Sequence, residues 1–478
     1  MTGLRSTYPT TVPGVAYPVA ALFALLFLSL LPQTLLIYLI LGTALVLVFR
    51  GRRWLALVAG GNGLVEQTIP EFRVPPLGKP TRNVRLWLGA ATVLMAGLLE
   101  GRRLALGPGA AYVVVAGVAF VALVVLATSA GLTPHLTLSA MRYFGTGLLV
   151  MVLIPAVTSD HRDLKIVGAI IVGVLALSAV AALLQHYGPR GVPTFAVDGN
   201  GKFQNRSQGL TDSPITLAGE ATVGALVAWG MVTAQGLRRV PRRVFLLLMP
   251  VFLLGAYFSY TRTALAGIAA GMAMTVPLLR GRTRVLALVG LVAAGAAVGL
   301  DLRSGDSRYT SEALAENGRF VVLWQAAYRI ALDHPVLGIG YDSFTLLAPQ
   351  YFDRLSISDD MFSYQLGREL EKYDPHNDFL RVWQSYGTPA LAVYVLLMVG
   401  IGANFLRAYY RAGQPWLQGA GLGGFAALLG YAMHSAFHNS LDGNLMLWML
   451  GGFSMAALKV CGQRPAAGLP EAAGQRGR

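Results

Sequence analysis

The sequence predicts an all-α polytopic membrane protein, and three observations support this fold class. Of the 478 residues, 55% are hydrophobic and only 13% are charged, whereas about a quarter of the residues of a soluble globular protein are charged. Apolar runs near the roughly 20 residues needed to cross a bilayer recur along almost the whole chain. Basic residues cluster in the short connections beside these runs, as they do in the cytoplasmic loops of membrane proteins.

The apolar runs predict about twelve transmembrane helices, with thirteen as the upper count. The expected spans lie near residues 17–31, 33–49, 84–99, 110–128, 140–157, 165–184, 215–234, 243–258, 262–279, 285–300, 389–406, 417–436 and 441–459. Because Pro32 interrupts the first run, residues 17–49 form either two short spans or one span with an interfacial segment. Residues 54–83, rich in Gly, Pro and basic residues, are left without an assignment.

The charge distribution predicts the topology and excludes a nucleic-acid partner. The formal net charge is +15, but the basic residues flank spans instead of lining one face. The clusters lie at Arg50–Arg53, Arg238–Arg243, Arg280–Arg284 and Arg407–Arg411. If the last three clusters and the C-terminal tail are cytoplasmic, the alternation of spans places residues 185–214, 258–262 and 301–388 together on the opposite face. We therefore expect a multi-pass protein of a bacterial inner membrane with a periplasmic polar face.

Residues 301–388 form a large polar loop that divides the chain into three parts. The loop carries 13 acidic and 8 basic residues, in contrast to the basic remainder. A connection of this length needs internal structure. We expect residues 1–300 to form the N-terminal transmembrane helices, residues 301–388 to carry the catalytic elements, and residues 389–478 to form the C-terminal helices and a cytoplasmic tail.

Two helices are expected within the loop. The spacing of apolar residues over Gly318–Leu332 predicts an amphipathic helix along the membrane surface, which ends before Pro335. Gly338–Gly340 then indicates a turn. A second helix is expected to start at Asp374–His376, with Asp374 as the N-cap and Pro375 in the first turn, and to end at Gly387.

Three basic residues are candidates for the chemistry. His376 would lie in the first turn of the second helix, where the helix dipole favours a neutral imidazole that can take a proton from a hydroxyl; the alternative is a capping or packing role. Arg262 opens a span and could bind an anionic headgroup, or it could be an interfacial arginine that extends to water. Arg319 opposes its helix dipole, which favours a partner outside the helix.

Other polar residues give weaker signals. Lys202, Asn205 and Arg206 could line a glycan or acceptor entrance, or could belong to a solvated loop. His434 and His438 have i, i+4 spacing at the end of a span, but no second ligand motif accompanies them, which favours packing over metal binding. The predicted spans carry few charges, unlike those of a polysaccharide flippase or transporter, which favours surface chemistry.

Four motifs, in this order, carry a resemblance to a known family. They are Ser259–Ala264 (SYTRTA), Gly318–Phe320 (GRF) leading to Trp324, Pro335–Tyr341 (PVLGIGY) with Phe344, and His376–Leu380 (HNDFL) leading to Gly387. Their succession between spans, over about residues 240–400, resembles the O-antigen ligase/polymerase superfamily of membrane glycosyltransferases. One departure is that Gln384 or Ser385 stands where this family often has an acidic residue.

The resemblance implies a GT-C-like membrane fold and transfer of a glycan from undecaprenyl diphosphate on the periplasmic face, without a metal or other cofactor. His376 matches the family's essential histidine, and Arg262 and Arg319 match its two essential arginines. Asn377, Lys202 and Arg206 are expected to assist substrate binding. Because no metal is expected, arginines and helix N-termini must stabilise the charge of the diphosphate.

The resulting hypothesis is an O-antigen ligase of lipopolysaccharide biosynthesis. It would join a glycan from undecaprenyl diphosphate to lipid A-core oligosaccharide by inverting transfer, with His376 as the base and membrane lipids around it. Two alternatives of the same class stay open, an O-antigen polymerase and a protein O-oligosaccharyltransferase, because they share these motifs.

Overall fold

The computed structural model describes a bundle of helices and, in the residues it describes, contains no β-strand. The described residues are 108–187, 206–211, 213–285, 287–289, 291–292, 318–352, 374–441 and 444–462. The helices are α5 (Pro108–Ala130), η1 (Pro134–Leu136), α6 (Thr137–Val157), α7 (His161–Tyr187), α8 (Pro214–Thr233), α9 (Arg239–Phe258), α10 (Arg262–Thr275), η2 (Val276–Leu278), α13 (Gly318–Asp333), α14 (Phe344–Phe352), α16 (Asp378–Arg411), α17 (Pro415–Ser435) and α18 (Met446–Cys461). The all-helical prediction is confirmed.

Six of the described helices are long and apolar enough to cross a membrane, which supports a multi-pass membrane protein. They are α5, α6 together with η1, α7, α8, α9 and α16. Helices α10 and α18 are apolar but shorter. Residues 17–99, which hold the first three expected spans, and most of the expected span 285–300 lie outside the described residues, so the full count of spans stays a prediction.

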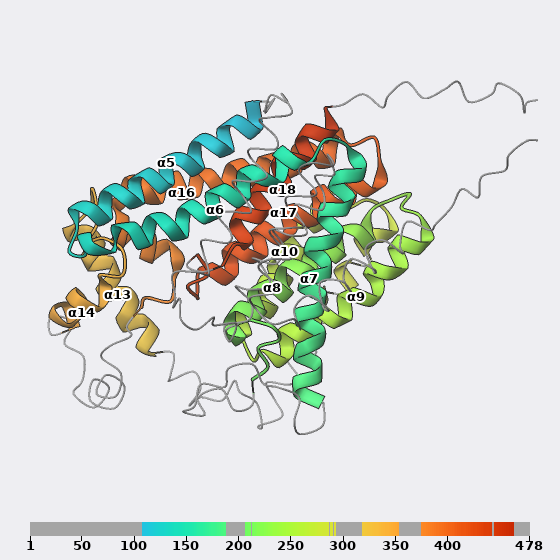
Figure 1. Cartoon of the computed structure of the whole chain (residues 1–478). Helices are drawn as coiled ribbons and strands as arrows, with labels where there is room; N and C mark the ends of the chain where they lie inside the picture. The colour runs from blue at the N-terminus through green and yellow to red at the C-terminus, as the bar shows by residue number, and fades with distance from the viewer. Residues whose placement is uncertain are drawn as a thin grey trace, which may run out of the picture.

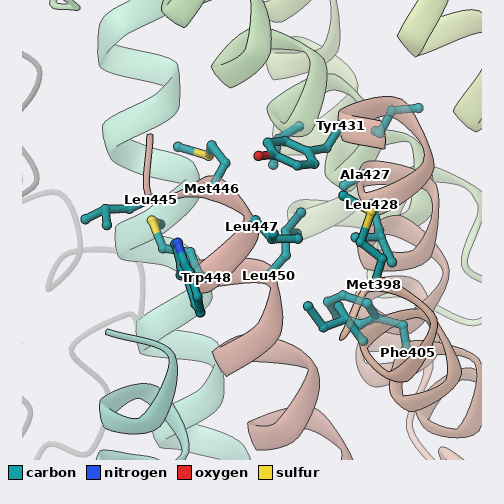
Figure 2. Packing of buried hydrophobic residues seen from close by; sticks show 14 of the residues in the cluster. Met398, Phe405, Ala427, Leu428, Tyr431, Leu445, Met446, Leu447, Trp448 and Leu450 are labelled. Atoms are coloured by element: carbon teal, nitrogen blue, oxygen red, sulfur yellow. The ribbon is translucent and has the colours of Figure 1, made fainter. Parts of the chain in front are cut away.

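Helix α17 lies at the centre of the bundle, where it packs against α8, α10, α16 and α18 (Figure 1). Small residues allow the closest crossing: a Cβ added at Gly230 of α8 would meet the backbone of Gly423 in α17. Such contacts let helix backbones approach closely where apolar burial alone gives little drive for association. Figure 2 shows the core beside this crossing, in which Tyr431 of α17, Trp448 of α18 and Phe405 of α16 are buried.

The helix ends gather at two opposite ends of the bundle, as the alternation of spans predicts. At one end, the backbone N–H of Leu132 donates to the carbonyl of Ile339 at 2.9 Å. At the other end, the Lys459 ammonium donates to the carbonyl of Thr158 at 2.9 Å and the Tyr409 hydroxyl donates to the carbonyl of Leu278 at 2.9 Å. The second end also carries the basic clusters that follow α8 and η2 and the one that ends α16, so we expect it to be cytoplasmic.

A small helical unit covers the first end. Helix α13 has nearly the bounds predicted for the amphipathic helix and stops at Asp333, before Pro335. It packs against α14 and α16, beside the ends of α5 and α16 (Figure 1). Buried apolar side chains of α13 and α14, among them Ile330 and Phe352, form a second core. Gly338 and Gly340 have φ of +64° and +97°, which confirms the predicted turn.

The start of α16 differs from the prediction. The helix begins at Asp378 with Asn377 as its N-cap, and the side-chain oxygen of Asn377 accepts the N–H of Leu380 at 3.1 Å. His376 therefore precedes the helix and does not lie in its first turn. Its φ of +49° is incompatible with an α-helix, and Asp374 instead forms an ion pair with Arg381 at 3.1 Å. Gly387, with φ 83° and ψ 173°, interrupts α16 as expected.

Candidate active site

The segment that carries His376 is held between α13 and the connection after α17. The indole N–H of Trp324, on α13, donates to the carbonyl of Pro375 at 2.8 Å. The ring of the same tryptophan packs against Phe437, with ring centroids 5.6 Å apart. Trp324 thus contacts the residues directly before His376 and His438, and places the two segments side by side.

A buried carboxylate joins the same two segments from the other side. Asp378 is fully buried, and its two oxygens accept the backbone N–H of Ser440 at 3.1 and 3.0 Å. His376 lies two residues before Asp378, and His438 lies two residues before Ser440. The two histidines interact electrostatically, which agrees with this double attachment.

Arg206 stabilises the turn that opens α10. Its Nε donates to the carbonyl of Ser259 at 2.9 Å and its Nη2 donates to the Thr261 hydroxyl at 2.9 Å. Thr261 is the N-cap residue of α10, and the half-buried Arg262 is the first residue of the helix. The sequence placed residues 185–214 on the same face as the 258–262 junction, and for Arg206 this prediction is confirmed. Arg206 also interacts electrostatically with His438.

His434 and His438 connect the arginine turn with the His376 segment. The Nδ1 atom of His434 lies 3.2 Å from the Thr263 hydroxyl, one residue after Arg262. The rings of His434 and His438 have centroids 5.0 Å apart. Sequence reasoning assigned this pair to packing. Their i, i+4 spacing at the end of α17 is a signal that the two rings can lie together, although His438 follows the helix, but nothing in the sequence shows what the rings contact.

The electrostatic environment keeps His438 neutral and suits an anionic ligand. Burial lowers the pKa of His438 well below its usual range, and its neighbours His434, His376 and Arg206 lower this pKa further. Two arginines and three histidines therefore lie in neighbouring segments at one end of the bundle. A concentration of basic groups attracts phosphates, and guanidinium groups bind them through paired hydrogen bonds.

Residues 244–395 match a family model described as O-antigen ligase. This match supports an assignment to the O-antigen ligase/polymerase family. Family members are membrane glycosyltransferases that act, in general terms, on polyprenyl-linked glycans and lipid acceptors. The matched region includes Arg262, α13 and His376, but ends before His434 and begins after Arg206. No curated protein matches the chain.

The family motifs carry strained backbone. Among the described residues other than glycine, only Tyr260, Asp342 and His376 have positive φ, with values of 56°, 55° and 49°. Tyr260 lies in the Ser259–Ala264 motif that opens α10. Asp342 directly follows the Pro335–Tyr341 motif, and His376 is the first residue of the His376–Leu380 motif. Such conformations cost on the order of 1–3 kcal/mol each and are concentrated at functional sites.

Two of the O-antigen ligase motifs interlock through glycines. A Cβ at Gly338 would meet the backbone of Ser385, and a Cβ at Gly387 would meet the carbonyl of Val336. The N–H groups of Ile339 and Gly340 donate to the carbonyls of Gln384 and Ser385 at 3.0 and 2.8 Å.

Gln384 and Ser385 occupy the place where the family resemblance predicts an acidic residue. Both are buried, and the Gln384 amide donates to the Ser385 hydroxyl at 2.8 Å. In this chain the position thus contributes to packing between two motifs.

Three of the predicted site residues are placed only in part or not at all. Lys202 lies outside the described residues. Arg319 is in the first turn of α13, but its side chain is not among those described. Asn377 is half-buried, and its oxygen caps α16. The contact of Arg319 with Arg262 and His376 and the substrate-binding role of Asn377 stay predictions.

Within the part of the chain that the structure describes, no group of three or more His, Cys, Asp or Glu side chains could hold a metal ion.

Proposed function

We propose that this protein is an O-antigen ligase that transfers a glycan from undecaprenyl diphosphate to lipid A-core oligosaccharide. The observation that carries the proposal is the grouping of Arg206, Arg262 and His376 at one end of the bundle. Two of these three residues lie inside the region that matches the O-antigen ligase model. The end that holds them is opposite the basic clusters, which favours a periplasmic site.

The proposed reaction is a direct displacement at the anomeric carbon of the donor. The acceptor hydroxyl oxygen forms the new bond to this carbon while the bond from the carbon to the diphosphate oxygen breaks, so the configuration inverts. His376 takes the proton of the hydroxyl, and undecaprenyl diphosphate leaves with the bonding electron pair.

The arginines stabilise the charge that develops on the leaving diphosphate. Arg262 and Arg319 are proposed to bind its oxygens, and Arg206 is proposed to assist them from the turn before α10. Guanidinium–phosphate hydrogen bonds are roughly twice as strong as neutral ones. A hydrogen-bond donor that is already fixed before the reaction stabilises the transition state without further reorganisation. The bonds of Arg206 to Ser259 and Thr261 are proposed to fix the guanidinium group in this way.

The base is tested with purified protein, carrier-linked glycan and lipid A-core. We expect His376→Ala to lower the rate by about 100-fold or more. The matched control is His334→Ala, because His334 is an exposed histidine at the end of α13. Normal transfer by His376→Ala would overturn the mechanism.

The acceptor is tested in the same assay with three acceptors offered separately: lipid A-core, a second carrier-linked unit, and a Ser/Thr-containing peptide. Product with lipid A-core supports the ligase. Product only with the second carrier-linked unit would make the protein a polymerase, and product only with the peptide would make it a protein O-oligosaccharyltransferase.

A further inference from the structure

The His434–His438 pair has no role in the reaction described above, although it lies between its two halves. His434 reaches the residue after Arg262 through the Thr263 hydroxyl, at 3.2 Å. His438 lies on the segment that Asp378 and Trp324 join to the His376 segment. The rings of the pair are 5.0 Å apart, so one continuous set of contacts runs from the start of α10 to the start of α16.

The attachment of His434 is built into three helices. Its ring lies against Gly219 of α8, where an added Cβ would meet the ring at 3.4 Å. Together with the Thr263 contact, this packing uses α8, α10 and α17 to fix one imidazole. His434 is therefore suited to hold its neighbour in place.

His438 has one ring nitrogen that makes no hydrogen bond within the described part of the chain. Its Nδ1 atom is buried and has no hydrogen-bond partner among the described residues. The titratable or charged groups that interact with it are His434 from α17, His376 from the segment before α16, and Arg206 from the segment before α8. None of these groups is a carboxylate, so none of them stabilises a charged imidazolium at this position.

We propose that His438 is a positioning residue of the transfer site, whose imidazole faces His376 and leaves His376 as the group that takes the proton. His434 fixes His438 and ties it to the start of α10, and hence to Arg262. The inference rests on the proposed function only for the role of His376 as the base.

The neutrality of His438 matters because a charged side chain beside His376 would change the pKa of His376 and hence its strength as a base. A cation beside His376 would disfavour its protonated form and weaken it as a proton acceptor, whereas a carboxylate would favour that form. A neutral, polar neighbour can orient the base without either effect. The geometry thus predicts opposite results for opposite charges introduced at position 438.

The facing arrangement is tested without any assay of activity, by nuclear magnetic resonance titration of protein labelled at its seven histidines. We expect the titration midpoint of His376 to fall by about one pH unit in His438→Lys and to rise by a similar amount in His438→Asp. His438→Gln should leave it nearly unchanged. The control His334→Lys places the same charge at an exposed position directly after α13. It should not move the titration midpoint of His376.

The positioning role is tested by transfer kinetics of the same variants. We expect His438→Gln to lower kcat by about tenfold through loss of orientation, with the KM of the donor changed by less than about twofold. In His438→Lys, the acid limb of the rate profile should move to lower pH, because the rate rises as His376 loses its proton and this variant lowers the midpoint of that loss.

The outcomes separate this inference from the proposed function. If His438→Lys and His438→Asp both leave the His376 midpoint where His334→Lys leaves it, the two histidines do not face each other and the inference is wrong. If one variant does not fold, the other still decides, because the expected shifts have opposite signs. Wild-type kcat in His438→Gln would overturn the positioning role. If the midpoint shifts occur but the wild-type protein transfers no glycan, the proposed function fails by itself.

Discussion

Asp378 accepts the backbone N–H of Ser440 with both carboxylate oxygens, at 3.1 and 3.0 Å, and is fully buried. This contact joins Asp378, the first residue of α16, to Ser440 in the connection between α17 and α18. The whole of α16 and α17 lies between these two residues in the chain. It places the His376 and His438 segments next to each other. A charge-assisted bond to a buried N–H is stronger than a neutral one.

Removing this carboxylate should destabilise the first end of the bundle. In Asp378→Ala the Ser440 N–H stays buried without its acceptor, which costs about 1–3 kcal/mol. Asp378→Asn keeps one acceptor and should lose less. Thermal unfolding of the purified protein in detergent measures the order of the three Tm values, with wild type highest and Asp378→Ala lowest.

Asp160→Ala is the control for the Asp378 series. Asp160 also accepts backbone N–H groups, those of Arg162 and Asp163 at 2.7 and 2.9 Å, but it is exposed and lies at the opposite end. Loss of an exposed capping carboxylate costs about 1 kcal/mol. Equal Tm values for Asp160→Ala and Asp378→Ala would show that the buried contact has no special weight.

Trp324 is expected to affect catalysis more than stability. Trp324→Phe keeps a ring against Phe437 but removes the N–H that donates to Pro375, at a cost of about 1 kcal/mol. The His376 segment then loses its attachment to α13. We expect kcat to fall about five- to tenfold with little change in the donor KM, because misplacement of a reacting group acts on the chemical step.

Trp383→Phe is the matched control for Trp324→Phe. The indole N–H of Trp383 donates to the Thr388 hydroxyl at 2.9 Å, within α16 itself. The same substitution therefore removes the same kind of bond without loosening the His376 segment. If both variants lose kcat equally, the Trp324 contact with Pro375 does not position the base.

Local patterns in the sequence were sufficient for much of the fold. Apolar periodicity and Pro335 determined the helix now seen as α13, because both act within a few residues of chain. The positive φ of Gly338 and the interruption at Gly387 followed from the conformational freedom of glycine. The opening of α10 at Arg262 was likewise predicted from the change from polar to apolar residues.

The start of α16 was decided by tertiary contacts that the sequence does not show. Asp374 and Asn377 are both good N-cap residues, so local propensity did not choose between them. The ion pair of Asp374 with Arg381 and the attachment of Pro375 to Trp324 hold this segment in a non-helical path. The sequence does not reveal that the His438 segment lies beside the His376 segment for the same reason, since this placement depends on contacts between distant parts of the chain.

Arg206 should be sensitive even to a conservative substitution. Arg206→Lys keeps the charge but cannot donate from two fixed nitrogens to the Ser259 carbonyl and the Thr261 hydroxyl. We expect the turn before α10 to loosen and the donor KM to rise about three- to tenfold, corresponding to about 1 kcal/mol of lost binding. Arg243→Lys, an exposed change at the opposite end, should leave KM unchanged; a similar KM in both variants would contradict a role for Arg206 at the donor site.

Gly387 is expected to tolerate no side chain. Its φ of 83° and ψ of 173° belong to a region that is essentially restricted to glycine, and a Cβ would meet the carbonyl of Val336. Gly387→Ala should therefore combine backbone strain with separation of the two interlocked motifs. We expect it to be destabilised by more than about 3 kcal/mol, with poor recovery of folded protein.

Gly281→Ala is the control for Gly387→Ala. Gly281 also has positive φ, +59°, but a Cβ there would meet no atom within 4 Å, so only the conformational cost of about 1 kcal/mol remains. The measurement is Tm and folded yield of both variants under the same conditions. Gly387→Ala should be the less stable of the two, because it adds the contact with Val336 to a more restricted backbone conformation. A Gly387→Ala protein as stable as Gly281→Ala would mean that the two motifs are not held together at this glycine.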